Sequence, residues 1–190
     1  MSIVDKVVAA ITPPESDEAR VEARAKARAA AETNDWLSLV LDHHERIEAA
    51  FAAVKAARDR STRLAALKEL GVILTGHSNA EEASLYPALA RVDEKAHATM
   101  AYSEQAAAKL QMGLLENIAP MTQEFLDKLE HIRGAVAHHV YEEEGTWFLE
   151  LKEKLAAPDQ EKLTQRYQEE FDRYVGADAG GASSSRRRAS

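Results

Sequence analysis

Apolar side chains recur at every third or fourth position along most of this chain, and that spacing is typical of amphipathic α-helices. No stretch alternates apolar and polar residues in the manner of a β-strand. The pattern predicts four long helices, over residues 35 to about 58, 61 to about 92, about 94 to 118, and 122 to about 155. Consecutive helices of this length with short connections favour an all-α fold, an antiparallel, up-down-up-down four-helix bundle.

Residues at the predicted helix ends support these boundaries. Asp35 and Ser61 are suited to cap the first two helices, and Pro120 ends the third. Pro87 is expected to kink or end the second helix near its carboxyl end. Proline has this effect because it lacks a backbone N–H and its ring collides with the preceding turn.

Further segments flank the predicted bundle, which we place at residues 35–157. Residues 1–34 are expected to form a helical arm. It contains a short amphipathic helix at 3–11 and then a charged, alanine-rich helix that either stands apart or extends the first bundle helix. Residues 158–175 predict a short carboxyl-terminal helix, and residues 176–190 have the composition of a disordered tail.

The composition excludes several kinds of function. The absence of cysteine excludes disulfides, thiolate metal sites and cysteine nucleophiles. A formal charge of -8 argues against a nucleic-acid partner, and the arginines at 186–188 are interpreted as a solvated end. No apolar run approaches the roughly 20 residues of a membrane span, and the amino-terminal stretch lacks the pattern of a secretory signal. We therefore expect a cytoplasmic protein without a membrane partner; the sequence names no protein partner or oligomeric state.

Two stretches of the chain repeat one arrangement of histidine and glutamate. In "HSNAEEASLYP", His77 stands four residues before Glu81, and in "HHVYEEEGTWF", His139 stands four residues before Glu143. The correspondence continues in three further pairs: Glu82 with Glu144, Leu85 with Trp147, and Tyr86 with Phe148. Since the chain has only seven histidines, the repetition points to a chemical role.

Residues four apart on a helix lie on the same side, so each histidine and glutamate pair can bind one cation. A carboxylate has two oxygens, and each glutamate could also bridge two metal ions. Nitrogen and oxygen donors without thiolates suit iron, manganese or zinc. On the first helix, His44 shares a face with Ile47 and Phe51 and should point inward. The adjacent His43 lies about 100° away, so His44 is the better third donor.

Structural roles are the alternative interpretation for several of these side chains. Core or surface positions are expected for three histidines: His43, His97 and His131. Solvated or supporting charges are expected at three glutamates: Glu82, Glu142 and Glu144. Core aromatics that seal the bundle are expected at Tyr86, Trp147 and Phe148. The two histidine and glutamate pairs are harder to explain in this way, because buried carboxylates without partners would each cost several kcal/mol.

The two repeated segments around His77 and His139, together with "DHHERIEAAF" and "SEQAAAKLQMGLLENI", resemble the hemerythrin-like, HHE cation-binding family. The resemblance covers residues 36 to about 152, and the repeated H-x-x-x-E-E with a following aromatic is specific in this context. It implies a four-helix bundle around a non-haem di-iron centre. By position it implies three terminal ligands, His44, His77 and His139, and two bridging carboxylates, Glu81 and Glu143.

The third predicted helix departs from the family pattern. The family has a glutamate and histidine pair there, whereas this chain has Glu104 and Gln105, and glutamine is a poor iron ligand. Tyr102 lies three residues before Gln105 and about 60° from it around the helix axis, so its phenolate could reach inward instead. Glu104 is the better ligand by chemistry but sits about 100° off that face. If neither binds, water would occupy the position and the second metal would be held more weakly.

The resemblance implies a di-iron protein that binds dioxygen, peroxide or nitric oxide for sensing, scavenging or storage. Two other functions stay open. The missing histidine would suit an enzyme of the peroxidase or oxidase type. A metal-dependent interaction module would use the arm and the tail as contact points.

Overall fold

A computed structural model describes residues 15–92 and 94–176, and all regular structure within them is helical. The helix expected at 3–11 and the arginines at 186–188 lie outside these residues. The elements are α2 (Asp17–Ala30), α3 (Trp36–Ala56), α4 (Arg60–Ala83), α5 (Leu85–Arg91), α6 (Lys95–Leu115), α7 (Gln123–Glu142), the π-helical segment η1 (Glu143–Trp147), α8 (Phe148–Lys154) and α9 (Ala157–Val175). Among the described helices, none is long and apolar enough to cross a membrane.

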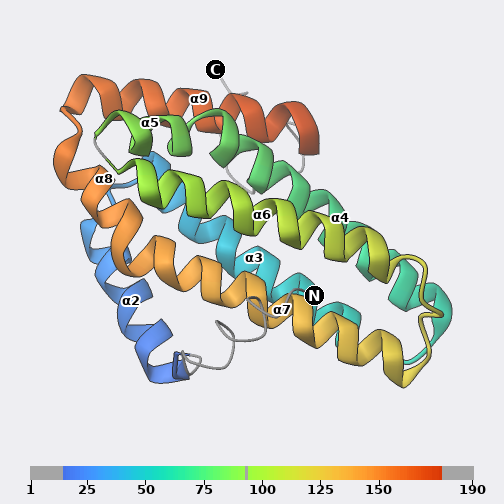
Figure 1. Cartoon of the computed structure of the whole chain (residues 1–190). Coiled ribbons are helices and arrows are strands. Elements are labelled where there is room, and N and C mark those ends of the chain that lie inside the picture. Colours follow the sequence, from blue (N-terminus) through green and yellow to red (C-terminus); the bar gives the residue numbers. More distant parts are fainter. Residues whose placement is uncertain (1–14, 93, 177–190) are drawn as a thin grey trace, which may run out of the picture.

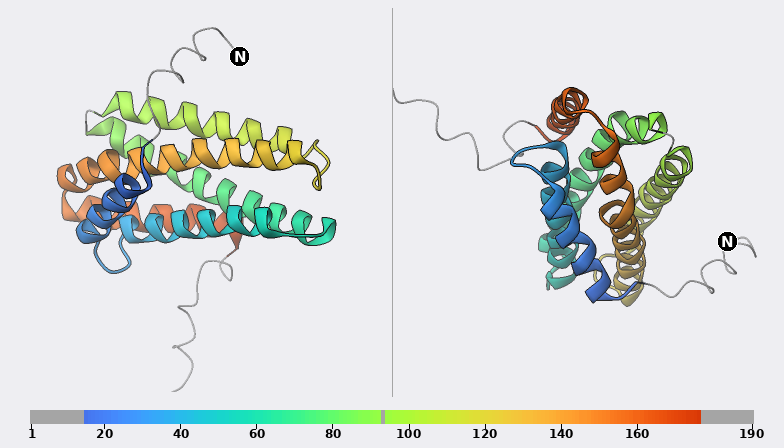
Figure 2. Two further views of the ribbon diagram at one scale, coloured as in Figure 1. Left: turned by 90° about the horizontal axis from the view of Figure 1, so that it is seen from below. Right: turned by 90° about the vertical axis from the view of Figure 1, so that its left-hand side faces the viewer.

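Four helices, α3, α4, α6 and α7, lie side by side and run in alternate directions (Figure 1). The all-α prediction is confirmed. α9 packs along α4 and α3, while α2 packs against α3, α7 and the η1–α8 end of the bundle. Figure 2 shows both of these helices on the outside of the four.

The charged, alanine-rich segment before the bundle neither stands apart nor extends α3. It forms α2, which buries Ala23 and Ala27 against the bundle. Small side chains on this face allow a close approach, so a helix with few large apolar residues can still pack. The chain then turns through Asn34, whose φ of 62° lies in the left-handed region. This turn separates α2 from α3.

α9 contributes to the same hydrophobic core as the bundle. Its residues Leu163, Tyr167 and Phe171 recur every fourth position on one face, and all three are buried. The backbone N–H of Trp36, at the start of α3, donates a hydrogen bond to the hydroxyl of Thr164 in α9. The last helix therefore both covers the bundle and satisfies one of the free N–H groups of α3.

Side-chain caps fix the starts of the first two bundle helices. The Asp35 carboxylate accepts a hydrogen bond from the N–H of Ser38, as its position in the sequence suggests. α4 begins after Asp59 rather than after Ser61, so the expected cap of this helix is wrong. The Asp59 carboxylate accepts hydrogen bonds from both the N–H and the hydroxyl of Thr62, which a serine hydroxyl would not match.

The second bundle helix is interrupted before its proline. α4 ends at Ala83, and Ser84 adopts φ −132° and ψ −62° before α5 begins. In a continuous α-helix the ring of Pro87 would collide with the carbonyl of Ala83, four residues earlier. The expected kink is confirmed. Tyr86, next to the proline, is completely buried.

The fourth bundle helix is predicted to run without a break to about residue 155, but it contains the π-helical segment η1. In a regular α-helix, Glu143 and Glu144 would point about 100° apart, and one of them would face away from the core. Both are buried here, with relative exposures of 0% and 1%. π-Helical bulges often occur at functional sites, and this one brings two successive carboxylates into the interior.

Two glycines of α4 offer a matched test of its packing against α9. A Cβ added at Gly76 would collide with the side chain of Val175, whereas one at Gly71 would meet no atom within 4 Å. We expect Gly71→Ala to stabilise the protein by up to about 1 kcal/mol, because alanine is the better helix former. Gly76→Ala should instead cost about 1–3 kcal/mol through overpacking. Thermal unfolding measures both changes. Equal shifts in unfolding temperature for the two variants would show that the end of α9 moves to accommodate the added Cβ at little cost.

Candidate metal centre

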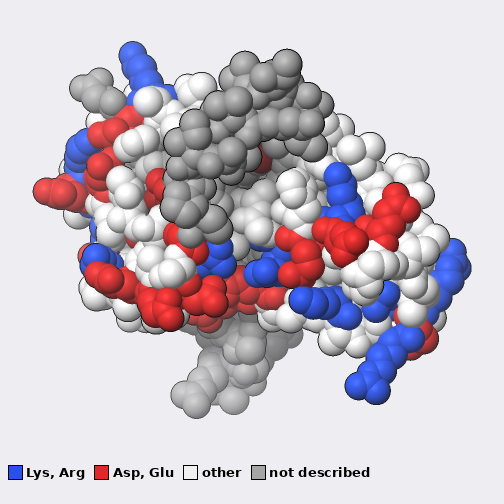
Figure 3. Space-filling view, turned by 60° about the horizontal axis from the view of Figure 1, so that its bottom comes forward, with Lys and Arg blue, Asp and Glu red and all other residues white. Residues whose placement is uncertain are grey.

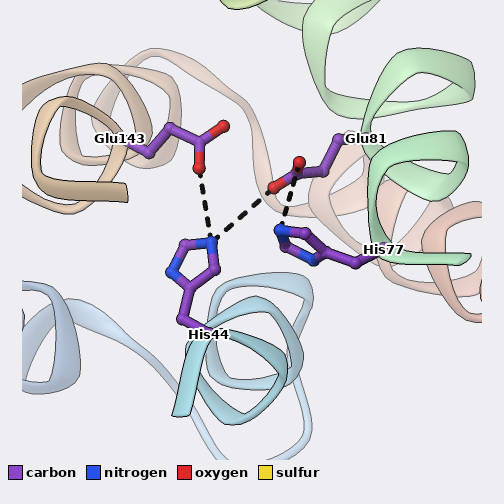
Figure 4. Close-up of side chains that lie close together, drawn as sticks. All are labelled: His44, His77, Glu81 and Glu143. Carbon is purple, nitrogen blue, oxygen red and sulfur yellow. Dashed lines mark ion pairs between the residues drawn. The ribbon is translucent and has the colours of Figure 1, made fainter. Parts of the chain in front are cut away.

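Four side chains from three elements meet inside the bundle (Figure 4). His44 comes from α3, His77 and Glu81 come from α4, and Glu143 is the first residue of η1. The Nε2 atom of His77 lies 3.2 Å from Glu81 Oε2. Nε2 of His44 lies 3.3 Å from Glu143 Oε2 and 3.9 Å from Glu81 Oε1. One donor atom from each of the four lies within 4.8 Å of the others, so all of them can approach a single ion.

The buried polar atoms of this cluster fit a cation. Nε2 of His44, Oε1 of Glu81 and Oε2 of Glu143 are buried and have no hydrogen-bond partner among the described residues. Leaving a carboxylate buried and unpaired is costly. A cation among them would satisfy all three atoms, and imidazole nitrogens with carboxylate oxygens are donors that iron, manganese and zinc accept.

His139 lies beyond the two glutamates, with a phenol hydroxyl beside it. Its Nε2 is 3.2 Å from Glu143 Oε1 and 3.0 Å from the hydroxyl of Tyr86. The same hydroxyl lies 2.9 Å from Glu143 Oε1 and 3.2 Å from Glu81 Oε2. Tyr86 was expected only as a core aromatic. Its ring is in the core, but its hydroxyl contacts three of the ligands that the family resemblance implies, Glu81, His139 and Glu143.

Gln105 occupies the position of the missing histidine on α6, and its side chain does face the centre. It is 4% exposed, and its amide nitrogen donates hydrogen bonds to Glu81 Oε2 and to the Tyr86 hydroxyl. These bonds tie the third bundle helix to the cluster without supplying an imidazole.

Tyr102 does not reach the centre, contrary to the expectation that its phenolate could point inward. Its side chain is 39% exposed, and its hydroxyl donates to the backbone carbonyl of Glu82 at 2.8 Å. Glu104 also lies off the inward face, as expected. It accepts a hydrogen bond of 2.8 Å from Nδ1 of His139 and so supports that ring from behind.

Glu144, the second residue of η1, supports His44 in a similar way. Its carboxylate accepts a 2.8 Å hydrogen bond from Nδ1 of His44, so that Nε2 faces the glutamates of the cluster. Arg24 of α2 donates from Nε and Nη2 to the same carboxylate. Of the two roles expected for Glu144, the supporting charge matches this geometry. No sequence signal indicated that Arg24 belongs to this site, because it lies 120 residues from Glu144 in the sequence, on a helix with little apolar face.

His43 does not join the cluster. Its ring stacks on Phe171 of α9, with centroids 3.7 Å apart, and its Nδ1 lies 2.7 Å from the hydroxyl of Tyr167. Burial and the positive charges of Arg46 and His44 lower the pKa of His43 to about 3. The choice of His44 over His43 as the inward-facing donor agrees with these contacts.

The remaining residues singled out in the sequence lie at the rim or surface. Glu82 pairs with the ammonium group of Lys109 at 2.7 Å, so the two repeats differ at this position. His131 is exposed. His97 is partly buried, stacks on Trp147 with centroids 5.7 Å apart, and has its Nδ1 3.2 Å from a carboxylate oxygen of Glu94.

Two hollows adjoin the candidate centre. An internal cavity of about 20 Å³ borders His77, Gln105 and His139. Its other walls are largely apolar and come from all four bundle helices, with Ile47, Leu74, Ala108, Ala135, Val136 and Val140. This volume holds roughly one water-sized molecule. A wider hollow of about 680 Å³ between α2, α3 and α7 reaches His44 and Glu144.

The charges of the cluster depend on one another. Burial lowers the pKa of His44, but the Glu143 and Glu144 carboxylates outweigh it and raise that pKa to about 9. Burial is likewise overcome at His139, mainly by Glu143, which raises its pKa to about 10. Burial raises the pKa of Glu143, but the rings of His139 and His44 outweigh burial and hold this pKa well below its usual value. Burial and the charge of Glu143 raise the pKa of Glu81 well above its usual value. In the metal-free protein, protons on His44, on His139 and on Glu81 thus balance the negative charge of the buried carboxylates. A bound cation could balance that charge instead.

The sequence model of one family, described as the hemerythrin HHE cation binding domain, matches residues 35–151. The chain belongs to the hemerythrin HHE cation-binding family. The match runs from the start of α3 into α8 and leaves α2 and α9 outside it. The cluster of histidine and glutamate side chains is therefore the candidate site for the cation of this HHE domain.

A solved structure has a similar fold. It is the crystal structure of a hemerythrin HHE cation binding domain-containing protein from Mycobacterium kansasii, with a TM-score of 0.66 and 21% sequence identity. The similarity covers 75% of this chain and 88% of that one. At this identity it shows the fold alone, and the fold is the expected helical one.

One curated relative has a different name. A protein of Nostoc sp. named DNA nickase is 24% identical to this HHE domain protein over 142 residues. The aligned region is 73% of this chain but 40% of the relative, so this chain spans less than half of that protein's length.

The pKa of His44 predicts how the metal-free protein responds to pH. A folded-state pKa of about 9, above the ordinary 6.5, contributes stability that is fully present below about pH 6.5 and is lost as the pH rises through 9. The difference in free energy of unfolding between wild type and His44→Gln should therefore shrink between about pH 5.5 and about pH 9.5. Urea unfolding of chelator-treated protein measures it. A difference that stays constant with pH would contradict the assignment of an imidazolium at His44.

Proposed function

We propose that this HHE domain protein is a non-haem di-iron protein that binds dioxygen or a related small oxidant, such as peroxide or nitric oxide, for sensing, scavenging or storage. The observation that carries the proposal is the convergence of buried imidazole and carboxylate donors whose hydrogen-bonding capacity is unmet. Three terminal ligands are proposed, His44, His77 and His139, with Glu81 and Glu143 as bridging carboxylates.

The orientation of the carboxylates supports a bridging role. Glu143 presents Oε2 to His44 and Oε1 to His139, so its two oxygens face different histidines. Glu81 presents Oε1 toward His44 and Oε2 toward His77 and Tyr86. When bound, a pair of iron ions supplies redox chemistry toward dioxygen, peroxide or nitric oxide. The protein's part is to hold the donors in a dry interior and to limit what can approach them.

The size of the internal cavity supports a small ligand. A volume of about 20 Å³ holds roughly one water-sized molecule, so this cavity favours a small ligand over an organic substrate. Its walls are mostly apolar but include Ser78 and Glu104, and a small neutral molecule fits them better than an extended polar one. The cavity borders Gln105, where the imidazole of the family pattern is missing.

A second candidate function, an enzyme of the peroxidase or oxidase type, is favoured by Tyr86 and Gln105. The amide of Gln105 replaces the histidine that the family pattern has on the third helix, and the buried phenol of Tyr86 lies next to this amide. Burial and the Glu143 and Glu81 carboxylates raise the pKa of Tyr86 well above its usual value, so its hydroxyl keeps its proton in the metal-free protein. The single hydrogen of that hydroxyl points to the two glutamates here, and it becomes available to an oxidant or a water molecule when the carboxylates bind metal instead.

The name of the Nostoc relative does not lead us to propose a nucleic-acid partner. This chain carries a formal charge of -8, whereas binding to a polyanion requires a basic surface that displaces counterions. On the face drawn in Figure 3, acidic and basic side chains are interspersed. The activity in the relative's name belongs to a protein of more than twice the aligned length.

Absorption spectroscopy of the purified full chain tests the proposal. The protein is loaded with ferrous iron and exposed in turn to dioxygen, peroxide and nitric oxide. A stable adduct with any of them supports binding, and repeated consumption of peroxide or dioxygen supports the enzymatic candidate. Metal-dependent folding with neither response would overturn both in favour of a metal-dependent interaction module.

The proposed ligands predict a pattern of metal loss. Glu81→Ala and Glu143→Ala should each lose most of the bound iron, because each side chain is proposed to contact both ions. His44→Gln should lose far more iron than His43→Gln, since only the former removes a donor from the cluster. Elemental analysis after gel filtration measures the iron content per chain. Equal losses at the two neighbouring histidines would contradict the proposed ligand set.

The position of Tyr86 predicts a spectroscopic contrast with Tyr102. If the ferric protein shows a visible charge-transfer band from a phenolate ligand, Tyr86→Phe should abolish it, because only the Tyr86 hydroxyl lies among the donors. Tyr102→Phe should leave the band unchanged, since that hydroxyl bonds a backbone carbonyl at the rim. Loss of such a band in Tyr102→Phe alone would overturn this assignment.

A further inference from the structure

One side chain from outside the matched HHE region reaches the candidate centre. Tyr167 lies in α9, beyond residue 151, where the family match ends. Its side chain is completely buried, and its hydroxyl lies 3.0 Å from Nδ1 of His77 and 2.7 Å from Nδ1 of His43. The phenol therefore joins two histidines of different helices, only one of which faces the cluster.

We propose that Tyr167 is a positioning residue for the metal site, and that its hydroxyl fixes the orientation and the tautomer of His77 so that an unprotonated Nε2 faces Glu81. The inference rests on the proposed function, because it assumes that His77 binds the metal.

The number of hydrogens on His77, Tyr167 and His43 determines which of these groups donates a hydrogen bond to which. A phenol has one hydrogen, so it donates to one of its two nitrogen neighbours and accepts from the other. A neutral imidazole that binds a metal through Nε2 keeps its hydrogen on Nδ1. Nδ1–H of His77 therefore donates to the oxygen of Tyr167, whose hydroxyl donates to Nδ1 of His43. Without the phenol, nothing in these contacts would select this tautomer.

The far end of this chain of hydrogen bonds is held rigidly. The ring of His43 stacks on Phe171 at an interplanar angle of 19° and lies edge-on to His77 at 89°. Both Phe171 and Tyr167 belong to α9, which packs along α4 and α3. The acceptor for the Tyr167 hydroxyl is thus fixed by the helix that carries the phenol.

The three proposed imidazole ligands differ in what supports them. His44 and His139 each donate from Nδ1 to a carboxylate, Glu144 and Glu104 respectively, whereas His77 is supported by the neutral Tyr167. Hydrogen bonds to the second nitrogen fix ring orientation and tune how strongly the ring binds a metal. A phenol in this place orients His77 without adding a further negative charge beside two buried glutamates.

Metal affinity of Tyr167→Phe tests the proposal, because this change removes the hydroxyl and keeps the ring. The full chain and its variants are titrated with ferrous iron, and separately with zinc, in competition with a chromophoric chelator. Tyr167→Phe should bind the metal about tenfold more weakly, the loss typical of removing a group that orients a ligand. Leu163→Ala is the matched control: it trims a buried side chain of α9 one turn away and should lower thermal stability with near-wild-type affinity.

Nitrogen-15 NMR of the zinc-loaded proteins gives a second readout. Wild type should show a protonated, hydrogen-bonded Nδ1 at His77, and Tyr167→Phe should lose that hydrogen-bonded signal. Wild-type affinity in Tyr167→Phe would overturn the proposal. An equal loss of affinity in Leu163→Ala would overturn it as well, by assigning the effect to packing of α9. If wild type itself binds neither metal, the proposed function fails, and this inference fails with it.

Discussion

Two carboxylates without access to water, Glu81 and Glu143, set the requirement that the surrounding structure meets. Burying an ionised carboxylate costs several kcal/mol unless opposite charges and hydrogen bonds compensate for it. In the metal-free protein the compensation comes from protons: His44 and His139 are held charged, and the pKa of Glu81 is raised. In the proposed function, metal ions replace these protons. Because ions that bind only the folded state stabilise it, stability and metal content would then be linked.

The two sequence repeats become unlike once they are folded, and the difference shapes the site. The first repeat ends its helix at a kink, beyond which the hydroxyl of Tyr86 enters the cluster. The second passes through the π-helical segment η1, which brings Glu144 inside to support His44, while Glu82 at the matching position pairs with a lysine at the rim. Phe148, opposite Tyr86 in the alignment, instead packs edge-on against Trp36. Similar local sequences thus provide similar candidate donors but different supports.

The helices outside the family match complete these supports. α2 supplies Arg24, which bonds the carboxylate behind His44, and α9 supplies Tyr167, which bonds the ring of His77. Each of the three proposed histidine ligands is therefore bonded at Nδ1 by a residue that is distant in the sequence and lies on another element packed nearby. The α2 and α9 segments bear on the chemistry of the site as well as on the size of the core.

The sequence by itself determined the helical class, the four bundle helices and the two histidine and glutamate pairs, because helical periodicity places residues four apart on one face. It also favoured His44 over His43, since its neighbours on that face are apolar. Only the tertiary structure decided which side chains meet across helices. It brought Tyr86 and Gln105 to the cluster, left Tyr102 at the rim, and placed Arg24 and Tyr167 behind the histidines. Local spacing fixes the direction of a side chain on its own helix, whereas contacts between distant segments depend on kinks, π-helical turns and packing that no short pattern encodes.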